Sequence, residues 1–275
     1  MGFFTKLSNG WKLAIAGFGV IKKNKQLLLF PVISGAALIV TTGSFIIIFL
    51  AGLGWETGHV VERSTAGDYV LTFIFYLINY FIIIFFNMGL IHCARLYFAG
   101  EEVTLGKGIA FSMSRIKDIL AWSVLAATVG LIFKLIEEYF GRVGQLISGL
   151  LGMVWSIATF FAVPVIAYEK VGPIEALKRS SQIMKEKWGE SIGATFSFGI
   201  IRILGILLIA VPLFFLGSTL NLFVGIALGA IAAFLVFAVV SAAEMIFVSA
   251  VYQHMNNIPV TDFDVNTLDA VFISK

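Results

Sequence analysis

The fold is decided by residues 222–252, which read LFVGIALGAIAAFLVFAVVSAAEMIFVSAVY and contain one charged residue, Glu244. A helix needs roughly 20 apolar residues to cross the hydrocarbon core of a bilayer, which is about 30 Å thick. This stretch is longer than that. Its apolar residues do not alternate with polar ones as the strands of a membrane barrel require. The stretch therefore predicts a transmembrane helix.

The rest of the chain has the same character. Hydrophobic residues make up 59% of the sequence and charged residues only 13%, with a mean hydropathy of +0.99. Soluble domains average about 45–50% apolar and about 25% charged residues, so lipid must be the solvent of this chain. We expect one all-α, polytopic membrane domain over residues 1–275. Its six predicted spans cover residues 27–53, 70–97, 119–137, 145–168, 191–216 and 222–252.

Basic residues gather in alternate connectors. One side of the predicted membrane domain holds fifteen lysines and arginines, whereas the other holds Arg63 and Arg142, with Lys134 near its edge. Because basic connectors stay on the cytoplasmic side, both termini are predicted to be cytoplasmic. The short tail, 253–275, then lies on the cytoplasmic side as well.

Three basic connectors are predicted to form amphipathic helices in the headgroup plane, at residues 3–23, 104–117 and 173–188, because their apolar residues recur at three- and four-residue steps. Each helix precedes a span, an outer turn and a returning span, so the chain reads as three hairpins. This order could reflect an internal repeat, or only the basic and amphipathic character of inner loops. The candidate contacts to anionic lipid are Lys12, Lys22, Lys23, Lys178, Arg179 and Lys185.

Two charges of opposite sign lie inside predicted spans. Arg202 and Glu244 lie in the fifth and sixth spans, both roughly 14–16 Å from the cytoplasmic ends at 1.5 Å per residue. Since a charge in lipid is costly, the matched depths predict an Arg202–Glu244 ion pair. In the alternative, Arg202 extends to the headgroups and Glu244 pairs elsewhere or is protonated. With Asn87 and His92, these residues form the candidate intramembrane polar site.

The sequence contains no motif of an enzyme. Nucleophile elbows, phosphate loops and dinucleotide fingerprints are missing, and His92 and Cys93 are adjacent, so on a helix they point apart. We expect no catalytic residues, no cofactor and no metal, and a net charge of +3 gives no reason to expect nucleic acid. The first functional interpretation is a scaffold or accessory subunit that contacts lipid, a membrane-protein partner or another copy of itself. The alternative is a transporter or channel for a small solute, ion or lipid, with its polar site around Arg202 and Glu244.

Several motifs resemble those of a known family. They are Leu27–Pro31 (LLLFP), Ala158–Pro164 (ATFFAVP), Gly172–Ser180 (GPIEALKRS) with Lys187–Gly189 (KWG), and a closing Phe263-Asp264 with Leu268 and Ala270–Phe272. Their order resembles an uncharacterised family of six-span prokaryotic membrane proteins, catalogued as a domain of unknown function. More distantly, the pattern is similar to the membrane domain beside some glycerophosphodiester phosphodiesterases, whose catalytic domain has no counterpart here. The resemblance implies the cytoplasmic (inner) membrane of a prokaryote and carries no activity.

Overall fold

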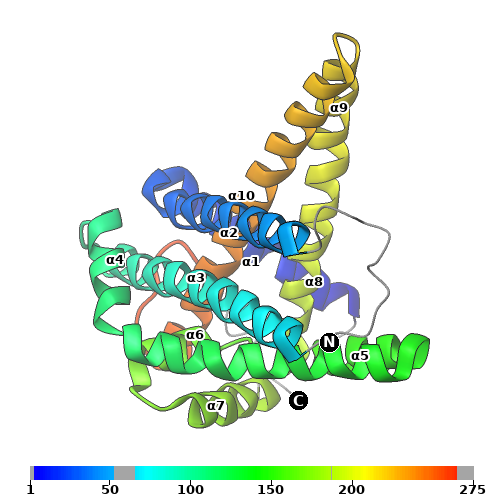
Figure 1. Ribbon diagram of the computed structural model, residues 1–275. Helices are drawn as coiled ribbons and strands as arrows, with labels where there is room; N and C mark the ends of the chain where they lie inside the picture. Colours follow the sequence, from blue (N-terminus) through cyan, green and yellow to red (C-terminus); the bar gives the residue numbers. More distant parts are fainter. Residues whose placement is uncertain (1–2, 53–65, 187, 265–275) are drawn as a thin grey trace.

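The computed structural model describes residues 3–52, 66–186 and 188–264, which form helices and short connections with no strand among them (Figure 1). The elements, in chain order, are α1 (Phe3–Lys23), the 3-10 helix η1 (Lys25–Leu28), α2 (Leu29–Gly52), α3 (Ala66–Phe98), α4 (Leu105–Ser114), α5 (Ile116–Ala158), α6 (Ala162–Glu169), α7 (Pro173–Glu186), α8 (Trp188–Gly205), the π-helical turn η3 (Ile206–Ala210), α9 (Val211–Ser218) and α10 (Leu222–Met255).

Local sequence sets the ends of several helices. The Thr104 hydroxyl accepts a hydrogen bond of 3.2 Å from the Lys107 amide and caps α4, as expected of a threonine at a helix start. Asn221 caps α10 in the same way, through the Phe223 amide at 2.8 Å. Pro173 is the first residue of α7, where its missing N–H costs no intrahelical bond. These residues fix where the connectors end and the helices begin.

Within the described residues, five helical stretches are long and apolar enough to cross a membrane: Lys25–Ala51, Ala66–Phe98, Ile116–Glu169, Ser197–Ser218 and Leu222–Met255. Large apolar side chains cover their outer surfaces. Leu208, for example, is 71% exposed and Phe223 is 80% exposed. Such surfaces are stable only in lipid or against another apolar surface. The expectation of an all-helical membrane domain is therefore confirmed, with five candidate spans where the sequence predicts six.

The difference in number lies in α5, which contains the predicted span 119–137 and most of the span 145–168. A straight helix would place Trp122 and Trp155 about 50 Å apart, but their rings stack 6.2 Å apart. The chain therefore reverses direction within α5. Gly141 makes the turn with a φ of +53°, a conformation that favours glycine. After the turn, Ser148 donates a hydrogen bond to Glu137 across the reversal.

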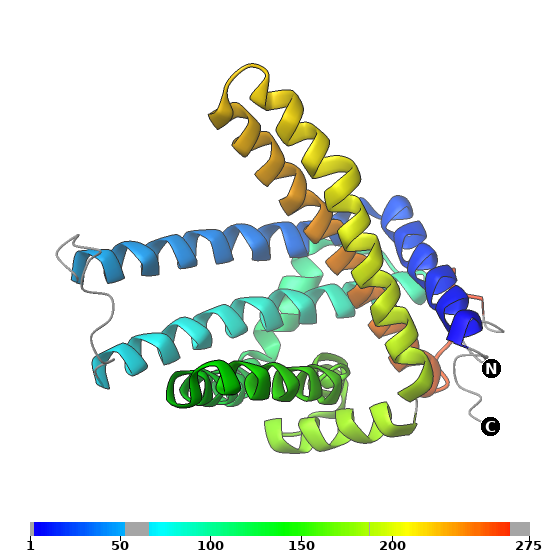
Figure 2. The ribbon, with the colours of Figure 1, turned by 90° about the vertical axis from the view of Figure 1, so that its right-hand side faces the viewer.

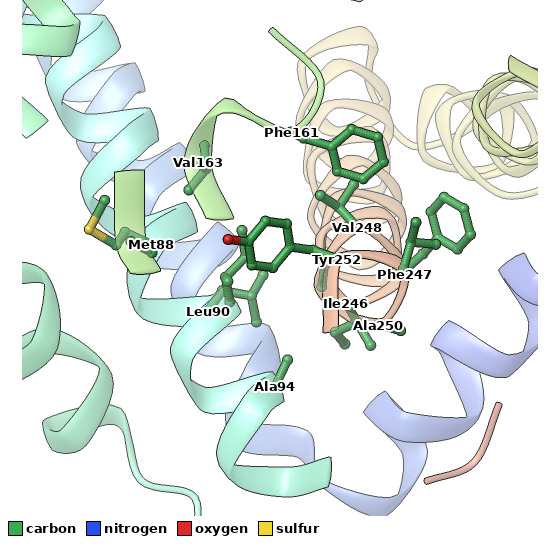
Figure 3. Packing of buried hydrophobic residues seen from close by; sticks show 14 of the residues in the cluster. Met88, Leu90, Ala94, Phe161, Val163, Ile246, Phe247, Val248, Ala250 and Tyr252 are labelled. Carbon is green, nitrogen blue, oxygen red and sulfur yellow. The ribbon is translucent and has the colours of Figure 1, made fainter. Parts of the chain in front are cut away.

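The helices pack together mainly at one end of the molecule. We call this the basic end; it is formed by α1, α4, α6, α7 and the last turns of α3 and α10. In α10, the side chains from Ala242 to Gln253 are largely buried, whereas those from Leu222 to Leu235 are mostly exposed. Figure 3 shows Phe247, Val248 and Tyr252 of α10 beside Phe161 and Leu90 in this core. Away from the basic end, the α9–α10 pair leaves at a steep angle to α2 and α3 (Figure 2).

The three helices predicted to lie in the headgroup plane are present as α1, α4 and α7, but each also packs closely on the spans. Small residues contribute to each of these contacts. In α1, a side chain at Gly17 would lie 2.8 Å from the Ala243 carbonyl oxygen of α10. In α4, the Ser112 hydroxyl donates to the Phe85 carbonyl at 2.7 Å. In α7, the Ser180 hydroxyl accepts from the Phe161 amide at 3.0 Å.

Some of the larger apolar residues of these three helices are exposed, whereas others, such as Leu13 and Ile183, are buried. Trp11 is 37% exposed, Met113 is 53% exposed and Ile174 is 54% exposed. These three residues belong to the apolar stripes that the sequence assigns to the membrane surface. Each helix therefore has one face packed on the protein and at least one large apolar side chain directed outward. The apolar stripe in the sequence did not predict the face that packs on the protein.

The segment after α10 is attached to the basic end. Asp262 accepts hydrogen bonds from the Lys23 ammonium group and the Tyr97 hydroxyl. These two bonds, that of Lys23 first, hold the pKa of the Asp262 carboxyl below its usual value. The next residue, Phe263, packs edge-on against Phe98 with 5.9 Å between the ring centroids. The chain therefore returns from α10 across the ends of α1 and α3.

Two glycines of α4 test the close packing of this helix. A side chain at Gly108 would overlap the Phe30 ring and lie 2.9 Å from the Cys93 sulfur, whereas nothing lies within 4 Å of a side chain at Gly106. We expect Gly108→Ala to lower the free energy of unfolding by roughly 1–3 kcal/mol. Gly106→Ala is expected to leave it unchanged or slightly raised, since alanine favours the helix. Thermal unfolding of the detergent-purified variants measures the difference, and equal melting temperatures would contradict the close approach of α4.

Candidate functional site

The buried charge pair predicted from the sequence is present. Arg202 of α8 donates from its Nη2 atom to Glu244 Oε2 of α10 at 3.1 Å, and the two side chains are 29% and 20% exposed. The Arg202 guanidinium also lies over the Phe237 ring, 5.1 Å from its centroid. Both charges lie on helices of the membrane domain, where an unpaired charge would be expensive. The ion pair and the ring contact together lower that cost.

Glu244 also faces a cavity of about 390 Å³ between α2, α3 and α10. The polar groups that line this cavity are Glu244 and Ser241 of α10, Asn87 of α3 and Ser34 of α2. Pro31, Leu38 and Phe234 belong to its apolar wall. We call this space the charge-pair cavity. It brings Glu244 and Asn87, two of the predicted site residues, to one place, with Arg202 bound to Glu244 beside it.

The helix that carries Arg202 changes its winding directly after the charge pair. The π-helical turn η3 follows α8, and the Val211 amide donates to the Ile206 carbonyl five residues back. Pro212 follows in the first turn of α9 and has no N–H to offer the preceding turn. The wider π turn accommodates the missing Pro212 donor, so the helical path continues from α8 through η3 into α9. Single π turns often occur at functional sites, and this one lies a few residues from Arg202.

His92 does not belong to the charge-pair cavity. It lines a second cavity of about 660 Å³ at the basic end, which we call the basic-end cavity. The His92 ring stacks on Phe111 of α4, with 4.0 Å between centroids and 4° between planes. The four-residue site predicted from the sequence is therefore divided: Arg202, Glu244 and Asn87 lie together, and His92 lies apart.

The six residues predicted to touch anionic lipid have two different settings. Lys12, Lys22, Lys178 and Lys185 are exposed. Lys23 and Arg179 form ion pairs within the protein: Lys23 binds Asp262, and the Arg179 Nε atom lies 3.3 Å from Glu169 Oε1. The four exposed lysines remain available for the predicted contacts with anionic lipid. Lys23 and Arg179 also hold the basic end together.

Sequence reasoning missed most of the basic-end cavity. Its other polar residues are Arg95, Glu101, Arg115, Tyr168 and Gln253. Arg95 and Arg115 counted only as positive charges of an inner connector, and Gln253 fell at the start of the predicted tail. The one signal available was that Arg95 follows His92 by three residues, which places both on one helix face.

The polar groups of the charge-pair cavity can bind a ligand through hydrogen bonds and charge. The charge-pair cavity offers one carboxylate, one amide and two hydroxyl groups. Among the described residues, no group of three or more His, Cys, Asp or Glu side chains is arranged to hold a metal ion. The native cysteine, Cys93, is buried and donates to the Thr104 carbonyl at 3.4 Å.

The long apolar helices, the lipid-facing side chains and the buried charge pair define an all-α, multi-pass membrane protein. Comparison with known families assigns this membrane protein to a narrower class. A model described as "Family of unknown function (DUF6159)" matches residues 66–262, and the chain belongs to this family. None of the curated proteins matches the chain. The expectation of an uncharacterised family is confirmed.

The charge pair can be tested by a double-mutant cycle. Glu244→Gln leaves the Arg202 guanidinium without its ion-pair partner, so we expect lower thermal stability in detergent. Arg202→Met in the same background removes the unpaired charge and is expected to recover part of the loss. The cycle should give a coupling energy of roughly 0.5–3 kcal/mol.

The control is a surface pair on α7. Lys178 and Glu175 are 3.9 Å apart with side chains that are 66% and 63% exposed, so Glu175→Gln is expected to change the stability very little. Additive effects of Glu244→Gln and Arg202→Met would contradict the pairing.

Proposed function

We propose that this protein is a non-enzymatic scaffold or accessory subunit of the membrane, which crosses the bilayer six times as three hairpins with both termini in the cytoplasm. The reversal at Gly141 supports the sixth crossing, because it divides the stretch Ile116–Glu169 into two antiparallel halves. The distribution of basic residues supports the orientation, since the connectors at the basic end carry most of the lysines and arginines. The proposed location is the inner membrane of a prokaryote.

Labelling of introduced cysteines tests the number and direction of the crossings. Arg142→Cys, next to the turn at Gly141, is expected to react with a membrane-impermeant maleimide in intact bacterial cells. Lys178→Cys, on α7, should react only after the cells are opened. The native Cys93 is buried and gives the background. Protection of Arg142→Cys in intact cells would contradict the sixth crossing.

The observation that carries the scaffold proposal is the arm formed by α9 and the first half of α10. The arm leaves the core at a steep angle (Figure 2) and exposes large apolar side chains on all sides. At its base, an apolar groove of about 420 Å³ runs between α1, α8, η3, α9 and α10, lined by residues such as Phe18, Gly205, Leu228 and Ile231. Helices in lipid associate through close van der Waals contact at such small and apolar surfaces. The arm therefore exposes apolar surface that the rest of the described chain does not cover. This surface is available to a partner.

A matched pair of variants tests the arm. Ile231→Ala with Leu235→Ala shortens two side chains that are 56% and 49% exposed on the arm. Ile39→Ala with Ile46→Ala shortens two that are 63% and 53% exposed on α2. We expect purification in mild detergent to recover a stoichiometric membrane-protein partner or second copy with the wild type and with the α2 variant. The arm variant should hold it roughly tenfold more weakly.

Transport is the second candidate, and the charge-pair cavity favours it. A carboxylate, an amide and two hydroxyls lining a space inside the membrane domain could bind a small polar solute or cation. The same purification separates the two candidates. A protein that purifies alone and moves a solute into liposomes, with the movement lost in Glu244→Gln, would overturn the scaffold proposal and support transport.

A further inference from the structure

The basic-end cavity lies between α3, α4, α6, the end of α10 and the segment that follows it. Its volume of about 660 Å³ is within the range of small-molecule sites. Two arginines, Arg95 and Arg115, face it together with one carboxylate, that of Glu101. Arg115 lies 3.6 Å from Asp118, so its charge is partly neutralised. Arg95 has no carboxylate partner among the described ion pairs and is the cation left for a ligand.

The position of Arg95 is fixed by a chain of contacts. Its guanidinium lies over the Tyr168 ring, 4.5 Å from the centroid. Tyr168 stacks on Tyr252 at 6.1 Å, and the Tyr252 hydroxyl donates to Glu169 at 3.0 Å. Figure 3 shows the Tyr252 ring reaching from α10 toward α3. A guanidinium that rests on a stacked ring is held in place before a ligand arrives, which lowers the entropy that binding costs.

Two buried polar atoms of residues that line this cavity have no hydrogen-bond partner within the described chain: His92 Nδ1 and Gln253 Oε1. Gln253 is the more telling of them, because its side chain is 99% buried and its Nε2 atom already donates to Ser249 Oγ at 3.1 Å. Its free oxygen therefore requires a donor. Leaving a buried polar atom without a partner is costly, so the Gln253 oxygen needs a donor that a bound water or a ligand can supply.

The depth of the cavity agrees with a lipid headgroup. At 33 residues, α3 is about 50 Å long, whereas the hydrocarbon core is about 30 Å thick. Arg95 lies three residues from the end of α3 at the basic end, so it reaches the level of the phosphates. His92 lies one turn deeper on the same face, beside Phe111.

We propose that the basic-end cavity binds a phosphate-bearing group, with Arg95 and His92 on the phosphate and Gln253 Oε1 accepting from a hydroxyl of the same ligand. Arginine holds phosphate through paired N–H donors. The ligand hydroxyl supplies the donor that Gln253 lacks. A lipid headgroup with a free hydroxyl and a soluble phosphate ester share this chemistry. The site is separate from the arm and the charge-pair cavity, so it does not depend on the function proposed for either.

Binding can be followed as thermal stabilisation of the detergent-purified chain. The probes are phosphatidylglycerol, phosphatidic acid, glycerol phosphate and inorganic phosphate, with phosphatidylcholine as the reference lipid. We expect phosphatidylglycerol or glycerol phosphate to raise the melting temperature. Arg95→Met should weaken that binding roughly tenfold or more. Lys117→Met removes an exposed charge of the same end that does not line the cavity, and should bind as the wild type does.

The probes also separate the sources of the ligand. Stabilisation by phosphatidylglycerol alone identifies a lipid headgroup, and stabilisation by glycerol phosphate without lipid identifies a soluble ester. Gln253→Met keeps both arginines and should abolish the preference for phosphatidylglycerol over phosphatidic acid, which lacks the headgroup hydroxyl. This comparison tests the proposed site even if Arg95→Met does not fold. Equal losses in Arg95→Met and Lys117→Met, or no stabilisation by any phosphate probe, would overturn the proposal.

Discussion

The close approach of α1 to α10 at Gly17 is the contact on which the rest of the structure depends. A single added carbon there would lie 2.8 Å from the Ala243 carbonyl oxygen. In lipid, apolar side chains gain little by leaving the solvent, so helices associate through close packing and hydrogen bonds instead. Small residues supply both requirements at the basic end: Gly108 against Phe30, Ser112 to the Phe85 carbonyl, and Ser180 to the Phe161 amide. The amphipathic helices are thus structural parts of the core as well as surface elements.

Because the helices pack mainly at the basic end, the α9–α10 arm diverges from the other helices. The α9–α10 arm has few constraints beyond η3 and diverges from α2 and α3, which leaves the charge-pair cavity at the point of divergence (Figure 2). The ion pair of Arg202 and Glu244 lies close to that point, where α8 and α10 still touch. Its charges hold the base of the arm in a region that offers little other polar contact.

The sequence predicted the membrane class and the charge pair because each depends on local or one-dimensional properties. Hydropathy identifies a span within one window, and two charges at equal depth on adjacent helices have few other partners. The division of the polar site was not predictable in the same way. Asn87 and His92 lie five residues apart on α3, and only the packing of α4 and α10 decides which cavity each one faces. A reversal between residues 137 and 145 was expected because the sequence predicts two spans there, but its geometry depends on Gly144 fitting against Ile136.

The two cavities differ in how their polar groups are satisfied, and this difference bears on function. In the charge-pair cavity, Glu244 is already bound to Arg202, so a ligand of Glu244 must compete with an existing ion pair, although the buried Arg202 Nε atom has no partner in the described chain. In the basic-end cavity, Gln253 Oε1 and His92 Nδ1 are buried without a partner in the described chain, and Arg95 rests on an aromatic ring rather than on a carboxylate. A ligand there does not have to break an ion pair, and it satisfies groups whose desolvation has already been incurred on folding. Binding energy is therefore more available at the basic end than at the charge pair. For this reason a tightly held ligand is expected beside Arg95, whereas the charge-pair cavity is suited to weak or transient occupation.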